Sequence, residues 1–301
     1  MHVSMFYIAI TADVDPDANC AAEGRPDART AGSQRIYVNG CRQGLATFLD
    51  ILKSLGLPAT FFWEARTLRL LSRTSPRMVS RAIDNTAHEH GCHGMRHIDF
   101  AGVETGILPS ADRVRDLISR AKDIVENITG QNPAGFRSPY CRLTNAVLSA
   151  IRELAYRYDA SETLRPGEDW DMHPFPLSGP ANGKSLWELP LTISRDQNGR
   201  LMSGYMWRLL ENSRPPKDYI ALATDLENSF PDGLLQFALH PWHFAVMEDG
   251  SPHTDQNEAK KNVRQVLSKL KKRAGIRFVT LSDYLSDVQS ASPESPPPTT
   301  E

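Results

Sequence analysis

Short apolar runs alternate along the chain with longer segments of helical periodicity. Met5–Ile10 and Ala59–Trp63 predict strands, and between them Leu45–Leu55 carries apolar residues at helical spacing until Gly56 ends the pattern. The other segments predict a helix at Val114–Ile128 and strands at Gly135–Phe136, Tyr156–Asp159, Leu186–Ile193, Leu234–His240 and Arg277–Leu281. Because the strand runs are apolar without alternation, they favour a parallel sheet covered by helices, most simply an α/β barrel.

Two segments fall outside this alternation. Asp17–Gly44 is long, polar and interrupted by glycine and proline, which predicts a large loop beside the carboxyl end of the first strand. Residues 288–301 are rich in proline and poor in apolar side chains, which predicts a disordered tail. We therefore expect one domain over residues 1–287, a length typical of a single α/β barrel.

The overall charge limits the classes of partner. The chain has 34 Lys and Arg against 36 Asp and Glu, so nothing in its composition indicates nucleic acid, and the balance suits a neutral or small substrate. Met1–Ile10 is too short and too polar for a signal peptide or a membrane span, so we expect a cytoplasmic protein. The sequence leaves open whether copies of the chain form a homo-oligomer.

The four cysteines are widely spaced and form no C-x-x-C pair. We therefore expect Cys20, Cys41, Cys92 and Cys141 to be free thiols.

Polar residues cluster where the predicted strands end. Asp13 and Asp15 follow the first apolar run, and side chains alternate along a strand, so both carboxylates should point the same way. His93 and His97 form a second pair, and nine histidines at random would give only roughly 0.3 pairs at any one spacing. Carboxylates with imidazoles are what a divalent metal and a nearby general base require. These residues predict a metal-dependent hydrolase whose site lies at the carboxyl ends of barrel strands.

Further motifs stand at later strand ends, and together they carry a family resemblance. The segments are T-A-D-V-D from Thr11, A-T-F-F-W from Ala59, H-E-H-G-C-H-G-M-R-H from His88, F-R-S-P-Y from Phe136, Y-D-A-S from Tyr158 and L-H-P-W from Leu239. With this set, in this order, the chain resembles the polysaccharide deacetylase family (carbohydrate esterase family four, with its NodB-like homology domain) from about Tyr7 to about Leu285.

The resemblance implies a distorted (β/α) barrel of about seven parallel strands. It also implies an enzyme that removes N-acetyl groups from an acetamido sugar or polysaccharide. Asp15, His93 and His97 would be the metal ligands, which suits Zn²⁺ best and is compatible with Fe²⁺ or Co²⁺. Asp13 would be the general base, and His240 the acid that protonates the leaving amine.

The resemblance extends to residues around these groups. Arg137 would hold and tune Asp13, and the backbone N–H of Tyr140 would stabilise the oxyanion. Trp187 and Trp242 would suit an aromatic wall against a sugar ring or an ordinary core equally well. Glu188 lies where the family has a D-W pair, which makes it a candidate for substrate binding or for the partner of Arg137.

Nearby residues have simpler interpretations. His88 and His90 form a competing H-x-H pair, but we predict that they pack in the strand or support the ligands from behind. Glu64, at the end of the second strand, is either a pocket residue or a solvated loop residue.

The spaced aspartates leave the substrate open. The commoner family pattern has adjacent aspartates, whereas D-V-D resembles a branch that includes peptidoglycan deacetylases and small-molecule amidases. One alternative is therefore a hydrolase of small cyclic or ureido amides, such as an allantoinase, although His97 argues against it. A second alternative is an inactive sugar-binding barrel. His243 stands where many members have an acidic residue, and the sequence gives no account of it.

Overall fold

The computed structural model describes residues 5–17, 37–103, 106–166, 170–181, 184–196 and 198–291. Its elements are β1 (Phe6–Val14), α1 (Asn39–Leu55), β2 (Thr60–Trp63), α2 (Ala65–Thr74), α3 (Pro76–Ile83), β3 (Glu89–Cys92), α4 (Ala111–Thr129), β4 (Gly135–Phe136), η2 (Pro139–Cys141), α5 (Asn145–Glu153), β5 (Tyr158–Asp159), β6 (Thr163–Leu164), β7 (Phe175–Ala181), β8 (Lys184–Glu188), β9 (Leu191–Arg195), β10 (Leu201–Ser203), α6 (Trp207–Leu210), α7 (Pro216–Ser229), β11 (Leu234–Leu239), η3 (Pro241–Phe244), α8 (Gln256–Lys271), β12 (Ile276–Val279) and α9 (Leu281–Ala291).

Strand β1 pairs with three other strands in the main sheet, which runs in the order β11-β1-β2-β3-β4-β5-β8-β7. β12 pairs with the first half of β1 and β2 with its second half, so these two strands share one edge of β1. The pairings between these strands are parallel, except that β7 runs antiparallel to β8. A parallel sheet needs cover on both faces, which explains why its strands appear as continuous apolar runs in the sequence.

The predicted strand at Leu186–Ile193 is wrong, because this run forms two strands. β8 ends at Glu188 and β9 begins at Leu191, with Pro190 between them, which has no N–H to continue a ladder. β8 pairs with β5, whereas β9 joins a separate sheet in the order β10-β9-β6. A parallel bridge between Tyr205 and Ala238 connects the chain after β10 to β11. The small sheet is thereby joined to the main sheet, and together they form a curled, distorted barrel.

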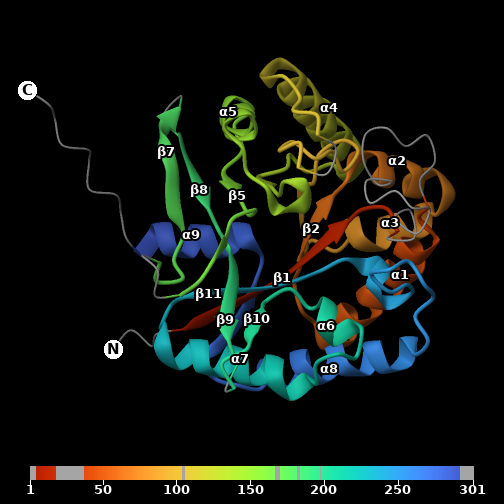
Figure 1. The fold of residues 1–301 in the computed structure, drawn as a ribbon, viewed down its shortest axis with the longest axis vertical. Helices are drawn as coiled ribbons and strands as arrows, with labels where there is room; N and C mark the ends of the chain where they lie inside the picture. Colours follow the sequence, from red (N-terminus) through yellow and green to blue (C-terminus); the bar gives the residue numbers. More distant parts are fainter. Residues whose placement is uncertain are drawn as a thin grey trace, which may run out of the picture.

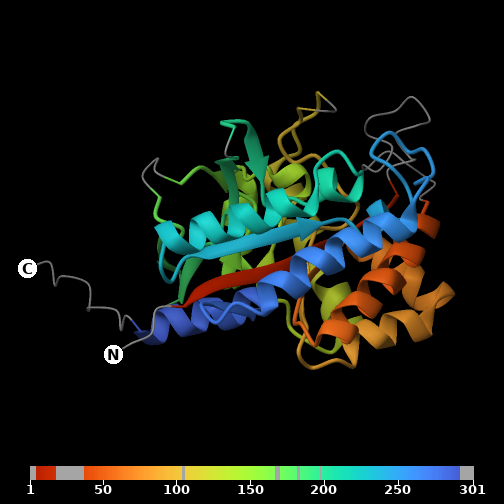
Figure 2. The same cartoon turned by 90° about the horizontal axis from the view of Figure 1, so that it is seen from below.

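Helices cover the outside of this barrel. In Figure 1, α4 and α5 lie along the top, α1 to α3 on the right, α9 on the left, and α7 and α8 along the bottom, where they pack on each other; Figure 2 shows this side of the molecule from below. The predicted helix at Val114–Ile128 is confirmed as α4, which buries its apolar side chains in the main core. Helix α1 packs closely on η3 at Gly44, where any Cβ atom would collide with the carbonyl oxygen of Pro241.

Two segment boundaries differ from the sequence prediction. Helix α1 begins at Asn39, inside the segment expected to be a loop, and residues 18–36 of that segment lie outside the described residues. Helix α9 continues to Ala291, past the boundary expected at residue 287, and the remainder of the expected tail also lies outside them. Among the helices that the structure describes, none is long and apolar enough to cross a membrane.

Candidate metal and acid-base site

The carboxyl ends of neighbouring strands bring the predicted site residues together. Asp13 lies within β1 and Asp15 directly after it, while His93 follows β3, Arg137 follows β4 and His240 follows β11. These strands are close neighbours in the order β11-β1-β2-β3-β4. The side chains of these five residues are buried or nearly so, which places a dense polar group at one end of an otherwise apolar barrel.

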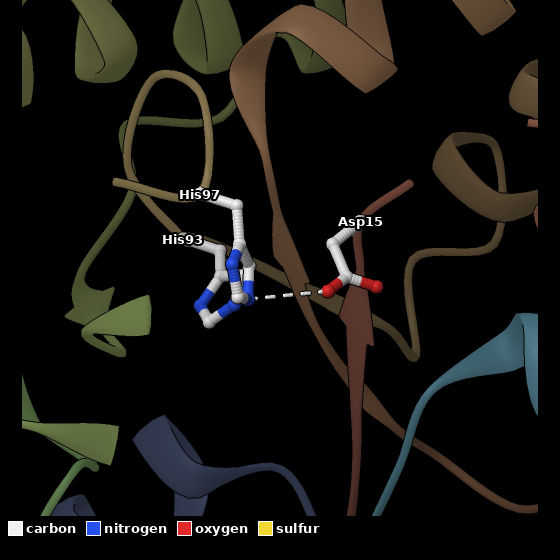
Figure 3. A group of neighbouring side chains, drawn as sticks. All are labelled: Asp15, His93 and His97. Carbon is white, nitrogen blue, oxygen red and sulfur yellow. Dashed lines mark ion pairs between the residues drawn. The ribbon is translucent and has the colours of Figure 1, made fainter. Parts of the chain in front are cut away.

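Asp15, His93 and His97 form a compact group of potential metal ligands. Each offers one ligand atom, and these atoms lie within 4.8 Å of one another. Nε2 of His97 lies 3.3 Å from Oδ2 of Asp15. Figure 3 shows both imidazole rings turned toward the carboxylate at the end of β1. One oxygen and two nitrogens at these separations fit the donor set of a zinc-like divalent ion with an open position.

Neighbouring groups hold two of these ligands in place. Nδ1 of His93 donates to the carbonyl oxygen of Arg137 at 2.9 Å, so the neutral ring carries its lone pair on Nε2, as a metal ligand must. The indole Nε1 of Trp242 donates to Oδ1 of Asp15 at 2.8 Å. Trp242 is completely buried, so of its two interpretations the structure supports a place in the core, from which it orients Asp15.

The loop that carries the two histidines has an unusual backbone. Gly94 has φ of 76° and His97 has φ of 51°, a region that residues with a side chain rarely adopt. The two imidazole rings lie 5.2 Å apart as a result of this turn. Tyr140, with φ of 60°, packs the edge of its ring against His97 at 4.6 Å, which places it beside the ligand group as expected.

Asp13 is held by a buried cation and a phenol. Nη1 of Arg137 donates to Oδ1 of Asp13 at 2.8 Å, and the hydroxyl of Tyr205 donates to Oδ2 at 2.8 Å. Burial raises the pKa of Asp13, but the charges of Arg137 and His93 and the hydrogen bond from Tyr205 outweigh it and lower this pKa below its ordinary value. Asp13 is therefore an ionised carboxylate with two fixed donors.

Arg137 is fully buried, and neighbouring groups bind its guanidinium. Besides Asp13, it donates to Thr11 Oγ1 at 3.0 Å, to the Ala160 carbonyl at 2.9 Å and to Gln236 Oε1 at 2.6 Å. The sequence analysis missed Gln236, although a glutamine within the apolar run of β11 was a visible signal for a buried polar partner.

Glu188 is not the partner of Arg137, whose guanidinium donates to Thr11, Asp13, Ala160 and Gln236 instead. It is fully buried and lies opposite Asp159 on the adjacent strand, where it accepts the N–H of Glu162 at 3.1 Å. Burial raises the pKa of Asp159 to about 6 and raises that of Glu188 well above its ordinary value, with the nearby Asp159 charge adding to the effect. The two carboxyls therefore act as a pair that retains a proton near neutral pH.

His240 lies at the open side of the site. Its side chain is 16% exposed, and its ring stacks on Trp242 with centroids 4.9 Å apart. Nε2 of His240 lies 3.6 Å from Oδ2 of Asp15 and 4.0 Å from Oδ2 of Asp13. Tyr205, which the sequence analysis also missed, places its hydroxyl 3.0 Å from this nitrogen. None of the sequence motifs contains Tyr205, which lies in an irregular segment after the short strand β10.

The structure gives His243 a local explanation. Its Nε2 lies 3.0 Å from Oε2 of Glu248 and 3.7 Å from Oε1 of Glu211, and its ring packs on Trp242 at 3.9 Å. His243 therefore pairs with Glu248 and Glu211, and its ring supports Trp242, the residue that holds Asp15.

The remaining sequence interpretations concern packing. Trp187 is half-buried and packs on the core cluster that contains Tyr158. His90 accepts a hydrogen bond from Trp63 Nε1 at 3.0 Å, and burial lowers the pKa of His88 and of His90 to about 4, in keeping with packing roles.

Glu64 is fully buried and caps α2, so neither of its expected roles is correct. Cys41, Cys92 and Cys141 are free as predicted, and Cys20 lies outside the described residues.

Comparison with known proteins agrees with these motifs. Residues 37–158 match the model of the polysaccharide deacetylase family. Peptidoglycan deacetylase of Helicobacter pylori is 24% identical over 135 residues, which cover 42% of this chain and 42% of that protein. This curated relative is therefore matched over less than half of its own length.

Solved structures share the fold over nearly the whole chain. A candidate polysaccharide deacetylase from Mycobacterium smegmatis has a TM-score of 0.62 at 20% identity, covering 96% of this chain and 92% of that one. Puue allantoinase has a TM-score of 0.66 at 15% identity, covering 98% and 93%. At these identities the structures establish the distorted α/β barrel and leave the reaction to the site residues.

Proposed function

We propose that this chain, whose residues 37–158 match the model of the polysaccharide deacetylase family, is a metal-dependent hydrolase that removes N-acetyl groups from an acetamido sugar or polysaccharide. The observation that carries this proposal is the group Asp15, His93 and His97 with a buried carboxylate, Asp13, beside it. A ligand set and a separate base are the two parts that metal-assisted amide hydrolysis needs.

The residues fit a divalent ion, most simply Zn²⁺, with Fe²⁺ or Co²⁺ as compatible alternatives. Asp15 and the two imidazoles would hold it, and the ion would supply Lewis-acid chemistry to the acetyl carbonyl and to the attacking water. Hydrogen bonds orient two of these residues: Trp242 holds Asp15, and the Arg137 carbonyl holds His93. This supports the assignment, because metal ligands are normally oriented by such hydrogen bonds.

The protein groups would then divide the proton transfers between them. Asp13, kept ionised by Arg137, would take a proton from the attacking water as its oxygen adds to the acetyl carbon. The backbone N–H of Tyr140 would stabilise the oxyanion that forms. His240, on the exposed side, would donate a proton to the sugar nitrogen as the C–N bond breaks, releasing acetate and an amine.

The alternatives differ in substrate or in activity. An allantoinase-like amidase shares the fold, as the similarity to Puue allantoinase shows, but the second histidine ligand, His97, favours the deacetylase. An inactive sugar-binding barrel has no need for a ligand group together with an oriented base. Acetate release from N-acetylglucosamine oligomers and from nucleotide sugars, with allantoin ring opening assayed alongside, separates the three functions.

A pair of variants tests the assignment of ligand and base. His93→Ala should lose both metal and acetate release, since it removes one of three anchoring bonds. Asp13→Asn should keep the metal and lower turnover by something on the order of 10²–10⁴, the usual effect of a general base. Metal content is measured by elemental analysis after gel filtration. Stoichiometric metal in His93→Ala, or near-normal turnover in Asp13→Asn, would refute the corresponding role.

A further inference from the structure

The phenol of Tyr205 lies between the proposed base and the proposed acid. Its oxygen is 2.8 Å from Oδ2 of Asp13, 3.0 Å from Nε2 of His240 and 3.2 Å from Nδ1 of the same ring. Tyr205 comes from the segment after β10, whereas Asp13 and His240 come from β1 and the end of β11. Three separate parts of the chain therefore meet at one hydroxyl.

Asp13 and His240 do not contact each other directly. Nε2 of His240 is 4.0 Å from the nearer Asp13 oxygen, which is too long for a hydrogen bond and for direct proton transfer. The Tyr205 hydroxyl spans this gap with two distances in the hydrogen-bonding range. The base is almost inaccessible, with 2% of its side chain exposed, so exchange of its proton with bulk water is restricted.

We propose that Tyr205 carries the proton taken up by Asp13 to His240, which couples the base and the acid of one catalytic cycle. In this step Asp13 passes the proton from the attacking water to the phenol oxygen, and the phenol passes its own proton to a ring nitrogen of His240. Asp13 returns to the carboxylate, Tyr205 stays neutral and His240 becomes the imidazolium. His240 then protonates the leaving amine, so the proton lost by water ends on the amine product.

The environment of Tyr205 suits this role. Burial, with the adjacent Asp13 charge, raises the pKa of Tyr205 well above its ordinary value, so the phenol stays protonated at neutral pH. A neutral hydroxyl can accept one proton while it donates another, which a phenolate cannot do. The proposal rests on the hydrolase function proposed above, and it adds Tyr205 to the residues that move protons there.

The test compares a substrate whose leaving group needs a proton with one whose leaving group does not. For Tyr205→Phe, kcat for an N-acetylated amide should fall about 10- to 100-fold, whereas kcat for an activated aryl acetate should fall only a few-fold. KM and bound metal should stay close to wild type. Tyr284→Phe is the matched control, because it also removes a buried phenol, one that donates to the Asp232 carbonyl at 3.2 Å, at the other end of β1 from Asp13. It should leave the amide-to-ester ratio unchanged.

A double variant gives the second readout. If Tyr205 acts through His240, then Tyr205→Phe combined with His240→Ala should cleave the amide no more slowly than His240→Ala alone. The relay would be overturned if the rate losses of the two single variants multiplied in the double variant, or if Tyr205→Phe lost equal activity on amide and ester. Tyr205 would then be a support for Asp13. The amide arm uses both an N-acetyl sugar and an acetanilide. Wild-type inactivity on the sugar alone would count against the proposed substrate, while the anilide-to-ester comparison would still decide the relay.

Discussion

Single buried side chains determine whether this site can work. Arg137 and Trp242 are both fully buried, and each donates to one of the two aspartates, Arg137 to Asp13 and Trp242 to Asp15. The two carboxylates are two residues apart, yet one is tied to a cation and the other to a neutral donor. This difference supports separate roles, because an ion pair keeps Asp13 a fixed anion while an indole leaves Asp15 its charge for a metal.

Replacing Trp242 should weaken metal binding without unfolding the protein. Trp242→Phe keeps an aromatic ring in the core but removes the donor to Asp15 Oδ1. Loss of such an orienting hydrogen bond typically lowers metal affinity by about 10- to 100-fold. Competition with a chelator measures this affinity. Trp170→Phe is the matched control, because its indole donates to the His173 carbonyl, away from the ligand group. Unchanged affinity in Trp242→Phe would show that the hydrogen bond has no part in holding the metal.

At the scale of elements, helix α2 supports the histidine loop. The N–H groups of Ala65 and Arg66, in the first turn of α2, donate to the carbonyls of Gly94 and Met95, which lie between His93 and His97. Glu64 caps the same turn by accepting from the N–H groups of Arg66 and Thr67 and from the Thr67 hydroxyl. A cap that fixes the start of α2 therefore also fixes the loop that carries His93 and His97.

The Glu64 cap should make stability depend on pH. Burial raises the pKa of Glu64 from 4.5 to about 7, so between these values the folded protein binds more protons than the unfolded chain. The free energy of unfolding should therefore fall as pH rises through this window, by an amount on the order of 3 kcal/mol from this residue. Because other buried carboxyls also titrate, urea unfolding is compared between wild type and Glu64→Gln at pH 5 and pH 8. Identical pH dependence in the two proteins would exclude this role for Glu64.

At the scale of the whole molecule, the ligand group joins two distant parts of the chain. Asp15 directly follows β1, and the two histidines follow β3, with β2 between these strands in the sheet. An ion bound there would bind the folded barrel and not the unfolded chain, where these groups are dispersed. Metal binding should thus add to the stability of the complete fold.

Added Zn²⁺ should raise the Tm of the metal-depleted wild type. Binding at a free concentration one hundred times Kd adds about 2.7 kcal/mol to the free energy of unfolding. His93→Ala should show little of this rise, whereas Asp13→Asn should retain it, because Asp13 lies beside the ligand group rather than in it. Calorimetry at several zinc concentrations makes the measurement. An equal rise in His93→Ala would place the stabilising ion elsewhere in the protein.

The sequence by itself determined the parallel α/β barrel and the convergence of polar residues at its strand ends, because both follow from local patterns. Apolar runs without alternation need cover on both faces, and carboxyl ends of parallel strands meet at one edge, so Asp13, Asp15, His93, Arg137 and His240 were bound to converge.

Only the tertiary structure decided which side chains surround that group. Gln236, rather than Glu188, binds Arg137; Trp242 holds Asp15 from a place in the core; and Tyr205 bridges Asp13 and His240. Each of these contacts joins residues on different strands or loops, and its existence depends on how the sheet curls and where Pro190 divides β8 from β9. A hydrogen bond forms only within a few tenths of an ångström of its ideal length, and strand pairing and packing fix positions to that degree, which a linear pattern cannot do.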